Sequence, residues 1–150
     1  MPILSESNQK QLQEVLESEI VDDVKVTLYT QPESPLIVPG RECTTCKETG
    51  ELLQEVTSLS DKLHLEVHDF YAEQEQAAEV GIHRIPAFIL EGQARGKVRF
   101  FGIPAGLEFP AFIDDVLDVS RGATSLAEGT REALQKLSKD VHIQVFTTPT

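Results

Sequence analysis

The sequence has few cysteines and no long apolar run, and each of these shortages excludes a class of protein. Its 150 residues include only two cysteines, too few for the disulfide framework of a small secreted protein. No stretch approaches the ~18 consecutive apolar residues that a membrane-spanning helix requires. The composition therefore points away from disulfide-rich secreted proteins and from integral membrane proteins.

Basic residues are also scarce. The chain has 13 lysines and arginines against 25 acidic residues, which gives a net charge of −12. Nucleic acids and anionic membranes bind basic surfaces, so neither is an expected partner. The N-terminal stretch MPILSESNQKQLQEVLESE is acidic and amphipathic, and it lacks the basic region and apolar core of a signal peptide. We therefore expect a cytoplasmic protein.

What is present is an alternation of strand-like and helix-like segments in a chain long enough for one domain with an appendage. The apolar patterns predict strands at 24–30, 62–70, 85–92, 97–102 and 141–147, and helices at 4–20, 44–59, 72–80, 107–119 and 127–138. Strands that alternate with helices predict an open α/β sheet. The predicted hairpin over 85–102 makes this sheet mixed.

The two cysteines form a C-x-x-C pair in GRECTTCKETG, where a proline-rich loop gives way to a predicted helix. Free amide groups and the helix dipole at a helix N-terminus favour a thiolate over a thiol. In this position Cys43 would be the exposed nucleophile, and Cys46, one turn further in, would resolve a mixed disulfide. Arg41 and Lys47 would stabilise the thiolate, whereas Glu42 would oppose it.

Two other interpretations of the cysteine pair fit the sequence less well. With His64 and His68, the pair mimics the spacing of a zinc finger, but a finger needs both histidines on one helical face. Here they lie on a predicted strand, where positions four apart are separated by roughly 13 Å. Buried core cysteines are the third possibility, although the neighbours of Cys43 are polar. The motif alone leaves all three open, and its place between a strand and a helix favours redox chemistry.

A proline stands where a later strand begins. In HRIPAF, Pro86 is at the start of a predicted strand, a position where no ladder hydrogen-bond donor is lost. The Ile85–Pro86 bond can also be cis, in a tight turn. Such a turn beside the cysteines would leave the backbone of Ile85 free to pair with an extended substrate chain. Ile85 and Pro86 are therefore candidate substrate-binding residues.

These motifs together resemble the thioredoxin fold: CTTC at a helix start, RIPAF before a β-hairpin, and a terminal helix. The segments ELLQEVTSLSDKLHLEVHDF, RFFGIPAGLEF, DVSRG and VHIQVFTTPT further resemble the N-terminal unit of the protein disulfide oxidoreductases, glutaredoxin-like proteins built from two tandem thioredoxin units. A related paired arrangement begins the flavoprotein partner of alkyl hydroperoxide reductase. The resemblance implies an α/β, thioredoxin-like fold with a central mixed β-sheet flanked by helices on both faces.

The resemblance also implies an organisation and residue roles. Residues 1–121 would form one thioredoxin-fold unit with its C-x-x-C, and residues 122–150 a linker, helix and strand like the start of a second unit. It likewise makes Cys43 the nucleophile, Cys46 the resolving thiol and Pro86 the cis-proline. The sequence departs from the family in the Thr-Thr dipeptide between the cysteines, in a longer loop before them, and in ending before a second C-x-x-C.

The sequence thus predicts a thiol–disulfide oxidoreductase that exchanges disulfides with protein substrates through Cys43 and Cys46. It implies no dissociable cofactor and no metal, and a thioredoxin-reductase-like donor or a second unit would regenerate the dithiol. The alternative is a redox-inactive docking module that presents the Pro86 groove and a sheet edge to a partner. The predicted strand 141–147 would pair within the chain or across a homodimer, because an unpaired edge invites association.

Overall fold

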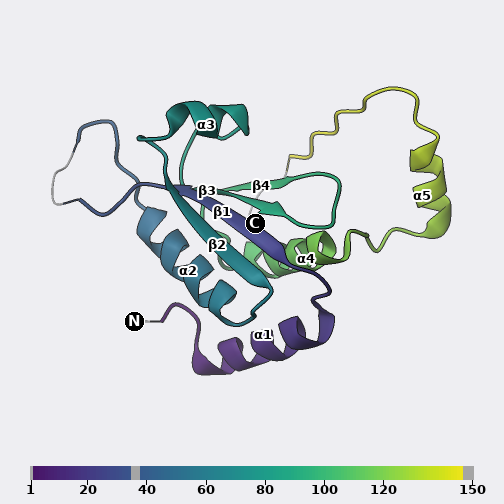
Figure 1. Cartoon of the computed structure of the whole chain (residues 1–150), viewed down its shortest axis with the longest axis horizontal. Coiled ribbons are helices and arrows are strands. Elements are labelled where there is room, and N and C mark those ends of the chain that lie inside the picture. The colour runs from purple at the N-terminus through teal and green to yellow at the C-terminus, as the bar shows by residue number, and fades with distance from the viewer. Residues whose placement is uncertain (1, 35–37, 147–150) are drawn as a thin grey trace.

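The computed structural model describes residues 2–34 and 38–146, and a four-stranded sheet of order β2-β1-β3-β4 lies at its centre (Figure 1). The strands are β1 (Val24–Thr30), β2 (Leu63–Asp69), β3 (Ala87–Glu91) and β4 (Val98–Phe101). The helices are α1 (Glu6–Glu19), α2 (Cys46–Ser58), α3 (Gln74–Glu79), α4 (Glu108–Arg121) and α5 (Glu128–Gln135). Among the described residues, no helix is long and apolar enough to cross a membrane.

The sheet is mixed, as predicted, because β1 pairs in parallel with β2 and antiparallel with β3. Tyr29 lies opposite Ala87, and Ala87 lies opposite Phe101 in the antiparallel pair of β3 and β4. The last residues of β1, β2 and β4 and the first residue of β3 therefore meet at one end of the sheet. This end carries the loops that contain the two cysteines and Pro86.

The larger core lies on the face of the sheet that α1, α2 and α4 cover (Figure 1). Leu12 and Leu16 of α1 and its C-cap residue Ile20 recur every four positions, so they lie on one side of the helix and face the sheet. The fully buried side chains of this core include Leu16, Leu28, Leu53, Phe88 and Phe112. One apolar face from each of these three helices thus completes the core.

On the opposite face of the sheet, α3 is the one helix that the described residues place over a smaller apolar cluster. Its buried members are Tyr29, Ala77, Ile82, Ala87 and Ile89. Helices therefore flank both faces of the sheet, as predicted, but to unequal extents. This unequal cover matters for the site, because the segment that contains Pro86 crosses the thinly covered face on its way from α3 to β3.

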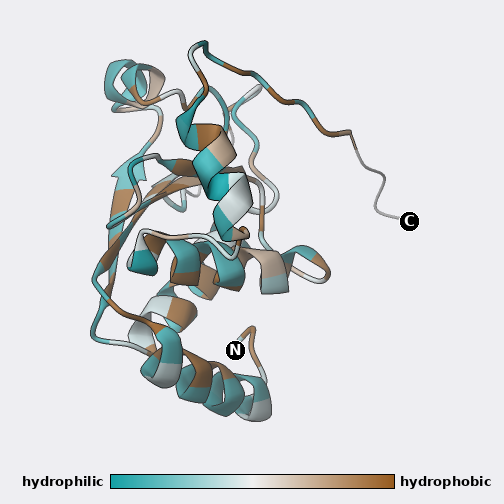
Figure 2. Cartoon of the chain, turned by 90° about the vertical axis from the view of Figure 1, so that its right-hand side faces the viewer, coloured by the Kyte–Doolittle hydropathy of each residue, from teal (hydrophilic) through white to brown (hydrophobic). Residues whose placement is uncertain are grey.

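The strand predicted over 141–147 is wrong as far as the structure describes it. Residues 141–146 form no strand, and the side chains of Val141, Ile143 and Val145 are between 61% and 79% exposed. Figure 2 shows this extended segment alternating between hydrophobic and hydrophilic residues. The alternation is strand-like, but a strand needs a neighbour to accept its hydrogen bonds, and in the described ranges none lies beside it. Residue 147 lies outside those ranges.

Candidate functional site

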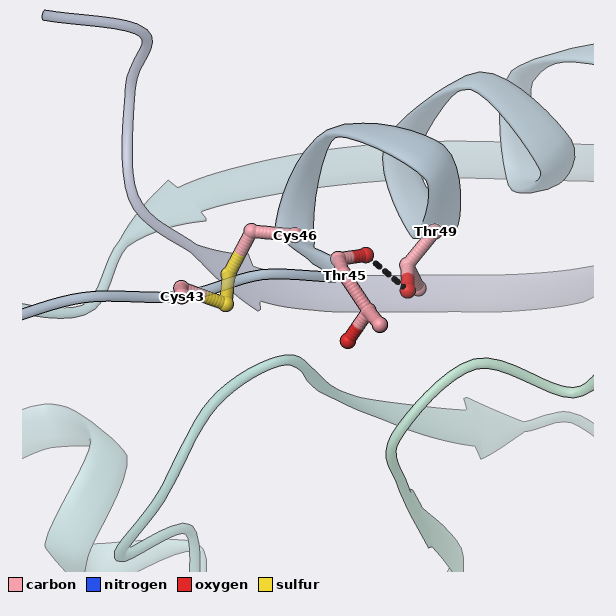
Figure 3. Close-up of a disulfide and its surroundings, with 4 residues drawn as sticks. All are labelled: Cys43, Thr45, Cys46 and Thr49. Carbon is pink, nitrogen blue, oxygen red and sulfur yellow. Dashed lines mark hydrogen bonds between the residues drawn. A yellow bond between two sulfur atoms is a disulfide. The ribbon is translucent and has the colours of Figure 1, made fainter.

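The two cysteines form a disulfide at the start of α2 (Figure 3). Their Sγ atoms are 2.01 Å apart and their Cα atoms 5.5 Å apart. The helix begins at Cys46, two residues later than predicted, so Cys43 lies in the loop before it. Cys46 is buried, with 4% of its surface exposed, whereas Cys43 is partly exposed. Cys43 is thus the more accessible of the two sulfurs.

The first turn of α2 leaves its amide groups facing this disulfide. Thr45 is the N-cap residue, but its side chain makes no capping hydrogen bond. Its carbonyl accepts hydrogen bonds from the N–H of Thr49 at 2.9 Å and from the Thr49 Oγ1 at 2.6 Å (Figure 3). Thr45 therefore does not compete for the free N–H groups of the first turn, which together with the helix dipole stabilise a nearby thiolate.

An open cavity of about 790 Å³ lies against the disulfide. Both cysteines line it, and the opposite wall comes from residues 31–34, which follow β1, and from Tyr71, which follows β2. Ile85 and Pro86 are not among the described residues that line it. The structure thus brings the cysteines together in one cavity and places the predicted proline outside its wall, at the same end of the sheet.

The two cations predicted to act on the Cys43 thiolate each have another partner. Lys47 forms an ion pair with Glu33 at 3.0 Å between Nζ and Oε1, and the hydrogen bond to Glu33 raises the pKa of Lys47. The Arg41 guanidinium lies 4.6 Å from the centre of the Tyr71 ring, within the range of a cation–π interaction. The start of α2 is therefore the more direct source of positive potential at the cysteines.

These two contacts join the loop after β1 to α2 and to the end of β2. The sequence does not predict either contact. The pair Glu33–Lys47 and the pair Arg41–Tyr71 belong to no local motif. A basic residue near a cysteine is visible in the sequence, but its acidic or aromatic partner is not. Both contacts shape the cavity wall beside Cys43.

The Ile85–Pro86 peptide bond is cis, as the resemblance to the thioredoxin fold implies. Pro86 directly precedes β3, and its carbonyl accepts a hydrogen bond from the N–H of Gly102 at 2.8 Å. This bond ties the start of β3 to the residue just after β4. Within the described ranges, Ile85 makes no backbone–backbone hydrogen bond.

The histidines of the zinc interpretation are engaged elsewhere. His68 Nδ1 lies 2.7 Å from the Glu73 carboxylate, and its ring stacks on Tyr29 at 5.1 Å between centroids. Burial, followed by the charges of Glu73 and Glu66, raises the pKa of Tyr29. His64 is exposed, 3.4 Å from Asp23. In the described part of the chain, no group of three or more His, Cys, Asp or Glu side chains is arranged to hold a metal.

The fold and the disulfide define a class of protein. A family model for the thioredoxin domain matches residues 36–114, which is more than half of the chain, and the chain therefore belongs to this family. Together with the Cys43–Cys46 disulfide, this membership supports thiol–disulfide exchange as its general chemistry. The resemblance seen in the sequence is thus confirmed at the level of the family and the fold.

Among curated proteins, the chain is similar in sequence to an alkyl hydroperoxide reductase component. The chain is 30% identical over 106 residues to AhpF, an alkyl hydroperoxide reductase component, of Staphylococcus aureus strain NCTC 8325, covering 69% of this chain and 18% of that protein. The same protein of a second S. aureus strain, COL, gives the same values. The chain thus spans less than a fifth of the length of the curated relatives that it matches.

Two solved structures are similar over most of the chain. A protein disulfide oxidoreductase from Aeropyrum pernix k1 has a TM-score of 0.72 and 26% identity, covering 89% of this chain and 55% of that one. The AhpF protein of Enterococcus faecalis also has a TM-score of 0.72, with 22% identity, covering 91% of this chain and 62% of that one. The second likeness shows the fold alone.

Proposed function

We propose that this chain is a thiol–disulfide oxidoreductase that exchanges disulfides with protein substrates through Cys43 and Cys46. The observation that carries the proposal is the position of their disulfide: it bridges the start of a helix and the loop before it, against an open cavity. A protein disulfide can reach a partly exposed sulfur there, while the buried partner remains within bonding distance.

In the reducing direction the Cys43 thiolate attacks one sulfur of the substrate disulfide. The substrate S–S bond breaks, a mixed disulfide forms at Cys43, and the other substrate sulfur leaves as a thiolate that takes up a proton. The Cys46 thiolate then attacks Cys43 Sγ, which releases the second substrate thiolate and forms the Cys43–Cys46 disulfide. Two electrons pass to the substrate, and in the oxidising direction the same steps run in reverse.

Ile85 and Pro86 would bind the polypeptide on either side of the substrate disulfide. The proposal is supported by the absence of a backbone–backbone hydrogen bond at Ile85 in the described structure and by the place of Pro86 at the same end of the sheet as the cysteines. A free N–H and C=O beside an extended substrate pair as an added strand would. Binding of this kind depends on the peptide backbone and little on the substrate sequence.

The oxidised protein would need an external dithiol to become a reductant again. We propose a reductase-type donor in the cytoplasm, or a further domain of a longer protein such as the AhpF relatives. No dissociable cofactor takes part in the proposed exchange, because both electrons move between sulfur atoms.

The test is the reduction of insulin disulfides by dithiothreitol, with and without the protein. The wild type should accelerate the reaction, and Cys43→Ser should reduce the rate to the uncatalysed background. Ser125→Ala, a change at an exposed residue that does not line the cavity, should leave the rate unchanged. Full activity in Cys43→Ser would contradict the assignment of the nucleophile. A wild type that does not cycle at all would contradict the proposal and favour the docking module.

A further inference from the structure

The segment between α3 and β3, residues 80–86, is held against the sheet by β4. Its last residue, Pro86, accepts the hydrogen bond from Gly102 just after β4. The Arg84 guanidinium lies 4.8 Å from the centre of the Phe101 ring, on β4 itself. These contacts fix the end of the segment nearest to β3. Its beginning is held by backbone hydrogen bonds to α3, among them that of the Ile82 N–H to the Ala77 carbonyl at 2.8 Å, and by one side chain of β4.

Arg99 is the side chain of β4 that contacts this beginning. Its Nε donates a hydrogen bond to the carbonyl of Val80 at 2.6 Å, the residue that ends α3. Carbonyls in the last turn of a helix lack partners within the helix, so this bond satisfies a group that would otherwise have none there. Side chains alternate along a strand, and Arg99 and Phe101 therefore project on the same face of the sheet, toward segment 80–86.

Gly81 brings the backbone of the segment close to this arginine. It has φ = +81°, a conformation that glycine adopts without strain. A Cβ atom at this position would lie 3.2 Å from the Nε of Arg99. The chain thus turns away from α3 directly against the arginine side chain. Arg99 contacts two successive residues at the point where the path toward Ile85 is set.

We propose that Arg99 is a positioning residue for the binding of protein disulfides: it fixes the start of segment 80–86 and thereby the place of the Ile85 backbone. The inference rests on the proposed function, in which Ile85 binds the substrate chain. Arg99 touches neither cysteine, so it should act on the affinity for a polypeptide and not on the reactivity of the thiols. The two effects can be measured separately.

The experiment compares Arg99→Met with the wild type in the insulin assay. We expect KM for insulin to rise about three- to tenfold, the change that follows the loss of one hydrogen bond, with little change in kcat. The reaction of the reduced protein with 5,5′-dithiobis(2-nitrobenzoate), a small disulfide that needs no backbone pairing, should keep its rate. Arg99→Lys, which retains a donor, should recover most of the lost affinity.

The matched control is Lys97→Met, which removes a cation next to β4 whose partner is Glu91, at 2.7 Å, and not segment 80–86. Lys97→Met should leave KM for insulin unchanged. Amide hydrogen exchange in residues 80–86 should accelerate in Arg99→Met and not in Lys97→Met. An unchanged KM in Arg99→Met, an equal rise in Lys97→Met, or a matching fall in the small-disulfide rate would overturn the inference. A wild type inactive toward insulin would instead overturn the proposed function.

Discussion

Residues 4–121 and residues 123–146 carry similar periodic apolar patterns, yet only the first region buries them. Leu16 and Val26 in the first region are at most 1% exposed, whereas Leu134 and Ile143 in the second are 49% and 79% exposed. In Figure 1, α5 stands apart from the sheet, and Figure 2 shows the segment that follows it running away from the sheet. Apolar periodicity therefore predicts that a segment can form an amphipathic helix or strand. Burial of its apolar face also requires a second apolar face to pack against.

The largest effect should come from truncating the centre of the first region. Phe88 is fully buried; its ring stacks on that of Phe100 at 5.1 Å between centroids and meets that of Phe112 edge-to-face at 5.3 Å. Phe88→Ala should lower the free energy of unfolding by about 3–5 kcal/mol, because it removes apolar contacts and leaves a cavity. The same change at the exposed Phe146 should alter it by less than about 0.5 kcal/mol. Urea unfolding measures both, and similar losses would show that the two regions are packed alike.

Gly92 in the first region and Gly129 in the second provide another test of how tightly each region is packed. A Cβ atom at Gly92 would lie 2.9 Å from both Cγ1 and the carbonyl oxygen of Val119, where β3 leads into close contact with α4. Gly92→Ala should therefore lower the free energy of unfolding by about 1–3 kcal/mol through overpacking. Gly129, in α5, has nothing within 4 Å of that position. Gly129→Ala should leave global unfolding unchanged, and a destabilisation equal to that of Gly92→Ala would show that α5 is packed.

A smaller effect concerns a half-buried acid of the first region. Burial, followed by the charges of Asp118 and Asp114, raises the pKa of Asp115. The folded state then holds its proton more tightly than the unfolded state, so stability falls as pH rises through the interval between the two pKa values. Asp115→Asn removes this penalty. It should stabilise the protein by less than about 1 kcal/mol at neutral pH, with the gain lost in acid.

The control for Asp115→Asn is Asp140→Asn, in the exposed second region. Urea unfolding at several pH values should give parallel curves for this control and the wild type. A flat profile for the wild type, or a gain in Asp115→Asn that persists in acid, would contradict the electrostatic explanation.

The smallest effect should come from removing the second region. A chain that ends after Gly122 loses only residues that bury nothing in the described structure. The division of the chain into residues 1–121 and 122–150 remains a prediction, and this truncated chain, which keeps the C-cap residue Gly122 of α4, tests it. Its free energy of unfolding should differ from that of the full chain by less than about 0.5 kcal/mol, and insulin reduction should continue. A clear loss of stability would show that residues 123–150 belong to the folded unit.

The sequence was sufficient for most of the sheet, because β1 and β3 carry their apolar pattern in short strands bounded by proline and glycine. The C-x-x-C and Pro86 could be found for the same reason, since each is a local motif. Residues 141–146 were mispredicted because pairing depends on a neighbour that no local pattern specifies. The bond between Arg99 and Val80 was equally invisible, as it joins residues brought together only by the fold.

The role of Cys43 as the nucleophile is tested most directly by the competition of the two thiols for a limiting alkylating agent. The reduced native protein is treated with substoichiometric iodoacetamide, and mass spectrometry locates the label, with the urea-unfolded chain as reference. We predict label almost entirely on Cys43, at a rate above that of the unfolded chain, because Cys43 is accessible at the start of α2 whereas Cys46 is buried. Equal labelling of Cys43 and Cys46, or a rate no faster than in the unfolded chain, would contradict this role.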